Sequence, residues 1–382
     1  MIIYIFTAPP FPSTHFIIPT RLSLHFMKQF FTSALLEWNR EDNTRAMPWK
    51  GEKDPYRIWL SEIILQQTRV EQGWAYYEKF IQAYPTVQQL AAAPEEDAFR
   101  LWQGLGYYAR CKNMLAAAKQ IVSQYHGHFP NTYEAIQSLK GIGPYTSAAI
   151  ASFAFNLPHA VLDGNVFRVL SRFFDIDTPI DSTAGKKQFA TLAAELLPHG
   201  ESAIYNQSIM DFGAVVCKPQ QPACKICPLA KKCKALHLNL VGVLPVKAKK
   251  LVIKKRYFNY LIVKHKDDLY IRKRTENDIW QNLHEFVLIE TTAPADITAL
   301  KKLPAFKEKV GDIRYNIDAV SASFKQQLTH QTIHSQFILL SAAKRPEMPG
   351  YTAVPKDQLD RYAFPKTITD FLKRGELSLF QY

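Results

Sequence analysis

Residues 139–146 read LKGIGPYT and lie between two stretches whose apolar residues recur at helical spacing. Glycines on both sides of Ile142 allow a tight turn with positive φ. Such a turn exposes backbone N–H groups at the N-terminus of the next helix, where a phosphate binds favourably. The stretch therefore predicts two helices joined by a phosphate-binding hairpin. Its candidate contacts are Lys140, Gly141 and Gly143.

An acidic residue follows this hairpin at a short distance. Residues 162–166 read LDGNV, and a helix is expected to begin near Asn165. Asp163 then has two possible roles, as the N-cap of that helix or as a functional carboxylate. A side chain at a helix N-terminus can do both, so we expect Asp163 to cap the helix and to serve a site near the hairpin.

A second carboxylate lies in residues 61–68, which read SEIILQQT. A lone glutamate in a helix is usually a solvated surface residue. Glu62, however, has apolar neighbours on several sides, which indicates a partly desolvated carboxyl group. Desolvation disfavours the charged form and raises the pKa. A carboxyl group that stays protonated near neutral pH can act as a general acid. Gln66, four residues on, shares the same helix face.

Four of the five cysteines fall within seventeen residues and have the spacing C-x6-C-x2-C-x5-C. They are Cys217, Cys224, Cys227 and Cys233. Disulfides are disfavoured because the chain shows no secretory signal. A structural zinc ion usually takes two C-x2-C pairs, and only one is present. An iron–sulfur cluster also takes four cysteines and suits uneven spacing, so both metal centres remain open, with iron–sulfur favoured.

The composition limits the class of protein. The chain has 382 residues, enough for two or three domains. Its formal net charge is +13, of which residues 1–250 carry +7 and residues 251–382 carry +6. A hydrophobic fraction of 47% excludes a disordered chain. No apolar run reaches the roughly 20 residues of a membrane-spanning helix. The basic excess indicates, weakly, a polyanionic partner.

The chain divides into regions of different character. The first 26 residues contain four prolines and lack the basic start of a signal peptide. Because Met27 precedes an amphipathic stretch, we expect residues 1–26 to be a disordered or untranslated leader and the protein to be intracellular. We expect a helical domain over 27–240 with a cysteine loop at 217–233, a basic linker over 241–256, and an α+β domain over 257–382.

Apolar periodicity and turn residues predict the individual elements. Asp54 and Pro55 predict a helix start, with the helix ending near residue 68. Further helices are expected over 75–83, 96–103, 113–125, 132–138, 145–154, 165–173, 185–197 and 202–216. In the C-terminal domain, strands are expected over 257–265, 269–274, 285–291 and 333–340, and helices over 357–362 and 366–375.

Taken together, these motifs resemble those of the MutY-type adenine DNA glycosylases, in the endonuclease III and helix-hairpin-helix superfamily, over nearly the whole chain from Met27. The matching segments are MPW (47–49), SEIILQQT (61–68), GLGYYAR (104–110), LKGIGPYT (139–146), LDGNVFRVLSR (162–172), QSIMDFGAVVC (207–217) and the cysteine spacing. The resemblance implies a mostly α catalytic domain with a [4Fe-4S] cluster on the four cysteines. The implied partner is double-stranded DNA that contains adenine opposite 8-oxoguanine or guanine.

The resemblance also implies roles for single residues. Glu62 would protonate adenine at N7, and Asp163 would stabilise the oxocarbenium-like sugar, which is the two-carboxylate chemistry of glycoside hydrolysis. The adenine would first leave the base stack. Asn165 and Tyr145 would lie beside the sugar, and Trp49 would help to form the adenine pocket. Gln66 and Tyr107 would insert into the duplex, with Thr68 and Leu105 close by. The alternative for Tyr107 is core packing, which we expect for Tyr108.

Tyr145 distinguishes the chain from endonuclease III. The matching residue there is a lysine whose amine forms a Schiff base with the sugar and drives strand cleavage. A tyrosine cannot do this, and Lys140 lies before the hairpin glycines, where a phosphate contact is expected. The resemblance therefore implies a monofunctional glycosylase.

The C-terminal domain resembles the Nudix-like recognition domain of the same family. It has no Nudix box of acidic residues, so pyrophosphate hydrolysis is not expected. The family's loop that reads the oxidised base matches Leu328, Thr329 and His330, with leucine in place of phenylalanine. A second register would use His334 instead, and a packed strand end is the plain alternative.

Two other functions stay open at this point. One is an endonuclease III-like glycosylase and lyase for oxidised pyrimidines. The other is an iron–sulfur DNA-binding protein without catalysis, which the presence of both Glu62 and Asp163 disfavours. We expect a monomer without membrane contact, in the bacterial cytoplasm and active at the nucleoid.

Overall fold

The computed structural model describes residues 21–47, 49–248 and 253–374. The N-terminal part is helical, as expected. Its helices are α1 (Arg21–Glu41), α2 (Pro55–Leu65), α3 (Val70–Ala83), α4 (Val87–Ala92), α5 (Glu95–Trp102), α6 (Ala109–Gln124), α7 (Tyr133–Gln137), α8 (Pro144–Phe155), α9 (Gly164–Phe174), α10 (Thr183–Leu196), α11 (Ser202–Val215) and α12 (Lys234–His237). The short 3-10 helices η1 (Cys224–Ile226) and η2 (Ala230–Lys232) precede α12.

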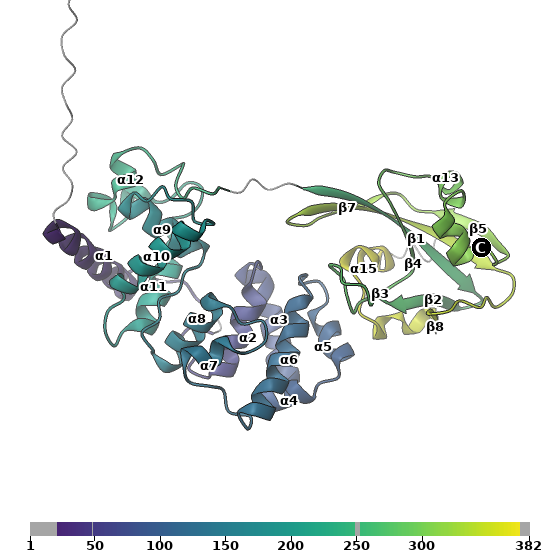
Figure 1. Ribbon diagram of the computed structural model, residues 1–382, viewed down its shortest axis with the longest axis horizontal. Coiled ribbons are helices and arrows are strands. Elements are labelled where there is room, and N and C mark those ends of the chain that lie inside the picture. Colours follow the sequence, from purple (N-terminus) through teal and green to yellow (C-terminus); the bar gives the residue numbers. More distant parts are fainter. Residues whose placement is uncertain (1–20, 48, 249–252, 375–382) are drawn as a thin grey trace, which may run out of the picture.

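These helices form two groups, each with its own core (Figure 1). Helices α2 to α8 pack around buried aromatic residues such as Trp59 and Trp102. Helices α1, α9, α10 and α11 pack around a second core that includes Phe31 and Phe173. Helix α8 contacts α2 of the first group and α11 of the second. The two groups therefore meet along α8, the helix that follows the predicted hairpin.

The hairpin lies between α7 and α8, as the glycines predict. Gly141 has a φ of +78°, and an added Cβ there would lie 2.6 Å from the Cβ of Asn113. Glycine is therefore required by both the backbone and the packing. Gly143 differs from the expectation, because its φ is −94° and it is simply the residue before α8. Only the first glycine has the left-handed conformation.

Local signals explain several helix boundaries. The Asp54 side chain accepts a hydrogen bond of 2.9 Å from the backbone N–H of Tyr56, so the predicted start of α2 is confirmed. That helix ends at Leu65, three residues earlier than expected. Helix α4 was not predicted, although Thr86 and Gln89 form a capping box at its start.

The C-terminal part is an α+β domain around a mixed sheet of eight strands (Figure 1). The strands are β1 (Lys254–His265), β2 (Asp268–Lys273), β3 (His284–Glu285), β4 (Val287–Thr291), β5 (Tyr315–Val320), β6 (Phe324–Gln327), β7 (Gln331–Ala342) and β8 (Thr352–Pro355). The long strands β1 and β7 pair in parallel at the centre, and the other pairings are antiparallel. The helices are α13 (Ile297–Lys301), α14 (Pro304–Val310), η3 (Lys356–Arg361) and α15 (Lys366–Lys373).

Helices cover both faces of this sheet. Side chains of a strand alternate between the two faces, so Phe258 and Tyr260 of β1 face one side and Leu261 and Val263 the other. The first pair shares a core with Phe371 of α15. The second pair packs in a core with residues of α13 and α14. The four predicted strands are present, whereas β5, β6, β8, α13 and α14 were not predicted.

Some expected boundaries differ from the structure. Helix α1 begins at Arg21, so it includes part of the segment that we expected to be a leader. The rest of that segment lies outside the described residues. Strand β1 begins at Lys254, inside the expected basic linker, and Arg256 of that strand forms ion pairs with Asp278 and Glu290. Arg256 is therefore a structural residue and not a solvated linker cation.

Side chains connect the two parts of the chain. The Gln103 Nε2 donates to Thr369 Oγ1 at 2.6 Å, and Lys112 Nζ donates to Gln281 Oε1 at 3.3 Å. Glu96 Oε1 lies 3.4 Å from His284 Nδ1. The C-terminal domain thus contacts the helical domain beside α5 and α6. Among the described helices, none combines the length and the apolar character that a membrane crossing requires.

Candidate active site

A cavity of about 880 Å³ opens where α2, α8 and α9 meet the segment before α2. Seven of the residues singled out from the sequence line it. They are Trp49, Glu62, Gln66, Thr68, Tyr145, Asp163 and Asn165. These residues are up to 116 positions apart in the chain, and the two helix groups bring them together. The cavity therefore collects the predicted catalytic residues in one place.

Glu62 lies in the last two turns of α2, and only 7% of its surface is exposed. The Tyr145 hydroxyl donates a hydrogen bond of 2.7 Å to Glu62 Oε2. Burial and the nearby Asp163 carboxylate raise the pKa of Glu62, the Tyr145 hydrogen bond opposes the rise, and the resulting pKa is about 7. Near neutral pH a substantial fraction of Glu62 is therefore protonated and able to donate a proton.

Asp163 precedes α9 and accepts two hydrogen bonds of 2.7 Å. The backbone N–H of Val166 donates to its Oδ1, and the Asn165 side-chain amide donates to its Oδ2. Burial raises the pKa of Asp163, although both hydrogen bonds favour the carboxylate and limit the rise. The residue is both the cap of α9 and a wall of the cavity, as the sequence predicted for its position.

Arg168, which the sequence analysis missed, fixes the orientation of Asn165. Its Nη2 donates to Asn165 Oδ1 at 2.8 Å and to the Gly213 carbonyl at 2.7 Å. Arginine can only donate, so the amide oxygen of Asn165 faces Arg168 and its NH₂ group faces Asp163. The Arg168 Nε also donates to the Cys217 carbonyl at 2.7 Å. The sequence signal was an arginine among apolar residues of α9, where it is 7% exposed.

Asp211 is a second residue that the sequence analysis missed. It is fully buried in α11, and Arg45 and Lys50 approach it at 2.8 and 3.2 Å. Gln207 also donates to it, at 2.8 Å. Arg45, Lys50 and Gln207 all line the cavity. Asp211 thus fixes these three cavity-lining side chains against α11. In the sequence, only its apolar neighbours indicated a buried acidic residue.

Trp49 lies on the same wall and is 8% exposed. Its ring makes an edge-to-face contact with Tyr77, with ring centres 5.3 Å apart. This contact fixes a flat apolar surface at the cavity. On the other side, Gln66 Nε2 lies 3.3 Å from Thr146 Oγ1.

The four clustered cysteines lie after α11, and three of them, Cys217, Cys227 and Cys233, pack against the core of α1 and α9. Arg172 Nη1 donates to Cys217 Sγ at 3.5 Å, and Cys233 Sγ lies 3.6 Å from the Arg172 carbonyl oxygen. Burial, together with the smaller effect of the other three thiols, raises the pKa of Cys227 to about 12. The four sulfur atoms are thus electrostatic neighbours, and as thiolates they would need a cationic centre to offset their repulsion.

The donor set of this loop fits a cluster of soft metal ions, since it offers four cysteine thiolates. The loop is also fixed to the helical core by Arg172, whose guanidinium donates to the carbonyl groups of Lys218 and Pro219. Within the described residues, no three His, Cys, Asp or Glu side chains are close enough together to form a metal site. The type and number of the ligands therefore fit the expected cofactor, whereas the described side chains do not converge on one metal position.

A second cavity, of about 560 Å³, lies between the two domains. It brings together residues that were expected to insert into the duplex or lie close by with the residues that were expected to read the oxidised base. They are Gln66, Leu105, Tyr107, Leu328, Thr329 and His330. Gln66 and Gln67 line this cavity and the catalytic cavity alike. The two cavities are therefore adjacent, and Thr68 lines only the catalytic one.

Tyr107 projects into the interdomain cavity from an unusual backbone conformation. It has a φ of +50°, lies between Gly106 and the buried Tyr108, and is 43% exposed. A non-glycine residue with positive φ is uncommon and often marks a functional position. The Tyr107 hydroxyl forms a hydrogen bond with Thr329 Oγ1 of the other domain. Tyr108, by contrast, is a core residue, as expected.

The two registers for the reading loop lead to different places. Leu328, Thr329 and His330 line the interdomain cavity, between β6 and β7. His334 lies on β7 and stacks on Tyr257, with ring centres 5.1 Å apart. The geometry therefore favours the first register.

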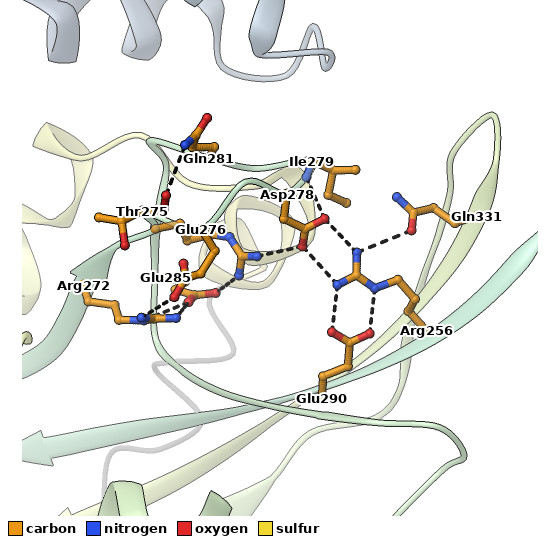
Figure 2. Close-up of polar contacts among 11 residues, drawn as sticks. Arg256, Arg272, Thr275, Glu276, Asp278, Ile279, Gln281, Glu285, Glu290 and Gln331 are labelled. Carbon is orange, nitrogen blue, oxygen red and sulfur yellow. Dashed lines mark hydrogen bonds and ion pairs between the residues drawn. The ribbon is translucent and has the colours of Figure 1, made fainter.

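Figure 2 shows a network of charged side chains beside this cavity. Asp278 lines the cavity and accepts hydrogen bonds of 3.0 Å from both Nη atoms of Arg256 and one of 2.9 Å from Arg274. Arg256 also donates to both oxygens of Glu290 at 2.7 Å. Each carboxylate of the network has at least one arginine partner, so its charge is neutralised and its position fixed.

The predicted hairpin lies on the surface, outside both cavities. Lys140, Gly141 and Gly143 are exposed, and Ile142 between them is buried. The backbone N–H of Lys140 donates to Gln120 Oε1 at 3.1 Å. The hairpin is open to a phosphate at this surface, and Lys140 is not placed to reach the catalytic cavity.

The chain is similar to known proteins in both of its parts. A family model of the HhH-GPD superfamily base excision DNA repair proteins matches residues 60–198, and a NUDIX domain model matches residues 259–374. An adenine DNA glycosylase of Buchnera aphidicola subsp. Baizongia pistaciae is 35% identical over 305 residues, or 80% of this chain and 84% of that protein. The human adenine DNA glycosylase is 39% identical over 214 residues, or 54% of this chain and 39% of that protein.

A solved structure agrees with the helical fold. The structure of a thermostable thymine-DNA glycosylase matches with a TM-score of 0.53 and 28% identity, over 56% of this chain and 99% of that one. The expected helical glycosylase domain and the NUDIX-like C-terminal domain are thereby confirmed. The chain belongs to the adenine DNA glycosylase family, and it is an enzyme that removes adenine from DNA by cleaving the N-glycosidic bond.

Proposed function

We propose that the substrate of this glycosylase is adenine opposite 8-oxoguanine, and also opposite guanine, in double-stranded DNA. The observation that carries the proposal is the pair of adjacent cavities that share Gln66 and Gln67. One contains two carboxylates suited to cleave a glycosidic bond, and the other contains the residues suited to contact the opposite base. A duplex with its adenine flipped out would occupy both.

In the catalytic cavity, Glu62 donates a proton to N7 of the flipped adenine. The bond between N9 and the sugar breaks, and its electron pair leaves with the base. The Asp163 carboxylate stabilises the positive charge that develops on the sugar. Water then adds to the sugar, either directly or after Asp163 has formed a covalent bond with the sugar. A carboxylate of the cavity accepts the proton that the water loses. The products are free adenine and an abasic site.

Neighbouring residues prepare this reaction. The Tyr145 hydroxyl holds Glu62 at 2.7 Å, and Asn165, oriented by Arg168, holds Asp163. Both contacts fix a reacting carboxylate before the substrate arrives, which reduces the reorganisation that the reaction requires. Trp49 provides a flat apolar face for the adenine ring. Thr68 lines the catalytic cavity together with Gln66 and Gln67.

We propose a monofunctional enzyme. Tyr145 occupies the position at which endonuclease III has its lysine, and a phenol forms no Schiff base. Burial and the Glu62 carboxylate raise the pKa of Tyr145 well above its ordinary value, so it stays a hydrogen-bond donor. Lys140 is exposed at the hairpin. Borohydride treatment during excision is expected to trap no DNA adduct, and a stoichiometric adduct would contradict this proposal.

On the opposite strand, Leu328, Thr329 and His330 would contact the oxidised base. The Thr329 hydroxyl and the His330 ring can both hydrogen-bond to its edge. Tyr107 and Gln66 would fill the space that the flipped adenine leaves, with Leu105 behind them. Lys140, Gly141 and Gly143 would hold a phosphate of the adenine strand.

The remaining parts of the proposal concern the whole chain. Cys217, Cys224, Cys227 and Cys233 would hold a [4Fe-4S] cluster, which would fix the loop over residues 217–233. The family matches lie on either side of residues 241–256, which supports a division into a helical domain over 27–240, a linker, and a recognition domain over 257–382. We further propose a monomer that acts in the bacterial cytoplasm, at the nucleoid.

Single-turnover excision on three duplexes tests the substrate. They contain adenine opposite 8-oxoguanine, adenine opposite guanine, and thymine glycol. We expect rapid excision from the first, slower excision from the second and none from the third. An intact adenine opposite 8-oxoguanine would contradict the proposal, and cleavage at thymine glycol would favour an oxidised-pyrimidine enzyme.

A further inference from the structure

A third cavity lies in the C-terminal domain, between β6 and α15. Figure 1 shows α15 on the side of this domain that faces the helical part. The volume of the cavity is about 320 Å³. Nine residues line it: five from residues 323–327, three from α15, and Arg374 directly after that helix. We name it the β6–α15 groove. None of the residues that line it was singled out from the sequence.

The groove is positively charged. Lys325, Lys366 and Arg374 line it, against a single carboxylate, that of Asp370. Lys366 Nζ lies 3.1 Å from Asp370 Oδ2 in an exposed pair. The Arg374 guanidinium lies over the ring of Phe324, 4.8 Å from its centre, so it stays at the groove. The net charge of the lining side chains favours an anion.

Polar atoms that lack a partner also line the groove. The Thr367 side chain is 3% exposed, and its Oγ1 has no hydrogen-bond partner among the described residues. The buried Oε1 of Gln326 has none there either. An unsatisfied buried polar atom is costly. At Thr367 a hydroxyl is available to donate to an incoming oxygen atom.

The start of α15 adds to this anion preference. Pro365 precedes the helix and provides no side-chain cap. The first N–H groups of a helix have no partner within the helix, and the helix dipole is positive at that end. Thr367 is in the first turn, so its free hydroxyl and the helix N-terminus lie at the same place. Together they can bind a tetrahedral anion such as a phosphate.

The groove also leads to the interdomain cavity. Gln326, Gln327 and Lys366 line both. Strand β6 ends at Gln327, and Leu328 to His330 follow directly. An extended chain that enters the interdomain cavity can therefore continue into the groove without leaving the protein surface.

We propose that the β6–α15 groove binds a phosphodiester of the DNA strand that carries the base opposite the adenine, next to the base held in the interdomain cavity. The inference rests on the proposed function and adds a contact that sets affinity and not chemistry. Phosphate contacts position a protein on DNA and do not read its sequence. The groove therefore strengthens binding to damaged and undamaged duplexes equally.

The test compares a double substitution, Lys325→Gln with Lys366→Gln, with a matched double substitution, Lys302→Gln with Lys307→Gln. The control lysines are equally exposed and lie at α13 and α14, which cover the opposite face of the sheet. Affinity for undamaged and 8-oxoguanine:adenine duplexes is measured between about 50 and 200 mM salt. This range is one over which phosphate contacts change binding strongly.

The slope of log affinity against log salt should fall by about 1 to 2 in the groove variant, because each lost phosphate contact removes about 0.9. Affinity should fall at least about tenfold for both duplexes at 100 mM salt. The slope and the affinity of the control variant should not change. An unchanged slope in the groove variant would overturn the proposal.

A separate variant, Thr367→Val, keeps the shape of the side chain and removes its hydroxyl. We expect weaker binding to both duplexes, by about tenfold, since a hydrogen bond to a charged group contributes about 1.5 kcal/mol. Binding equal to that of the unchanged chain would show that the hydroxyl faces no phosphate and would contradict the proposed arrangement.

Two further outcomes separate this proposal from others. A free deoxynucleoside triphosphate offers the same phosphate chemistry. If dATP bound to the unchanged chain and not to the groove variant, while the DNA salt slope stayed the same, the groove would be a nucleotide site. If the unchanged chain left adenine in place opposite 8-oxoguanine, the proposed substrate would fail, and the salt slopes would still decide on the groove.

Discussion

The catalytic cavity and the interdomain cavity both contain carboxylates, but their partners differ. Glu62 is held by a hydroxyl group and Asp163 by an amide and a backbone N–H. Asp278 of the interdomain cavity, by contrast, is held by Arg256 and Arg274. Burial alone would raise the pKa of Asp278, but the hydrogen bonds and charges of Arg256 and Arg274 lower it. Burial raises the pKa of Glu62 to about 7.

The difference in hydrogen-bond partners gives the carboxyl groups of the two cavities different properties. A carboxyl group with neutral partners can gain and lose a proton near neutral pH. One with arginine partners stays charged and fixes the position of a loop. The first cavity is therefore arranged for proton transfer, and the second is arranged to hold a shape against which a base can be read.

The largest effect is expected from the two catalytic carboxylates. Glu62→Gln removes the proton donor, and Asp163→Asn removes the negative charge beside the sugar. General acid catalysis contributes about 10² to 10⁴ in rate, so each variant should lose at least about a hundredfold in single-turnover excision. Asparagine is also a good N-cap, so the second variant should fold and bind DNA normally. If a variant kept an excision rate within tenfold of that of the unchanged chain, the substituted residue would not take part in the mechanism.

In the charged network, Arg274→Met tests whether fixed charges stabilise the C-terminal domain. Arg274 is 4% exposed, and Glu285, which it binds, is fully buried. Loss of one partner of a buried ion pair costs about 3 to 5 kcal/mol. Because Arg272 still binds Glu285, we expect the lower end, about 3 kcal/mol, in denaturant unfolding of the full chain. Asp370→Asn, in an exposed pair, is the control and should cost less than about 1 kcal/mol.

A smaller effect is expected at the interdomain cavity. Thr329→Ala removes the hydroxyl that meets Tyr107 and would face the opposite base. One hydrogen bond to a base edge discriminates by about 1 to 2 kcal/mol, so the preference for 8-oxoguanine:adenine over guanine:adenine should fall about fivefold to twentyfold. The excision rate from guanine:adenine is the internal control and should change little. An unchanged preference would place the recognition of the lesion elsewhere.

The smallest effect is expected from Tyr145→Phe. The Tyr145 hydrogen bond lowers the pKa of Glu62, so its loss should raise that pKa and move the alkaline limb of the rate profile to higher pH. The maximal rate should fall by less than about tenfold, because a single hydrogen bond contributes about 1 kcal/mol. A limb that moves to lower pH would show that the hydroxyl favours the protonated acid instead.

The catalytic cavity could be predicted well from the sequence. Asp54 and Pro55 marked the start of α2, and apolar neighbours marked Glu62 as buried. The spacing of the hairpin and Asp163 placed the second carboxylate. These signals are local, within a few residues of one helix end, where short-range hydrogen bonds and burial determine the structure.

The interdomain cavity could be predicted only as a set of residues. Its walls come from positions more than 200 residues apart, such as Tyr107 and Thr329, and no local pattern encodes their contact. Arg256 was expected to belong to a basic linker because it follows other basic residues, but its partners Asp278 and Glu290 are distant in sequence. Helix α4 was missed because its six residues include two glutamines and little apolar periodicity.

The pH dependence of single-turnover excision tests the central claim, that burial keeps Glu62 protonated for use as an acid. A general acid must be protonated to act, so the rate on 8-oxoguanine:adenine duplex should be higher at about pH 6 than at pH 8 and fall tenfold per pH unit well above pH 7. A rate that stays constant from pH 6 to pH 9, with DNA saturated throughout, would contradict the claim.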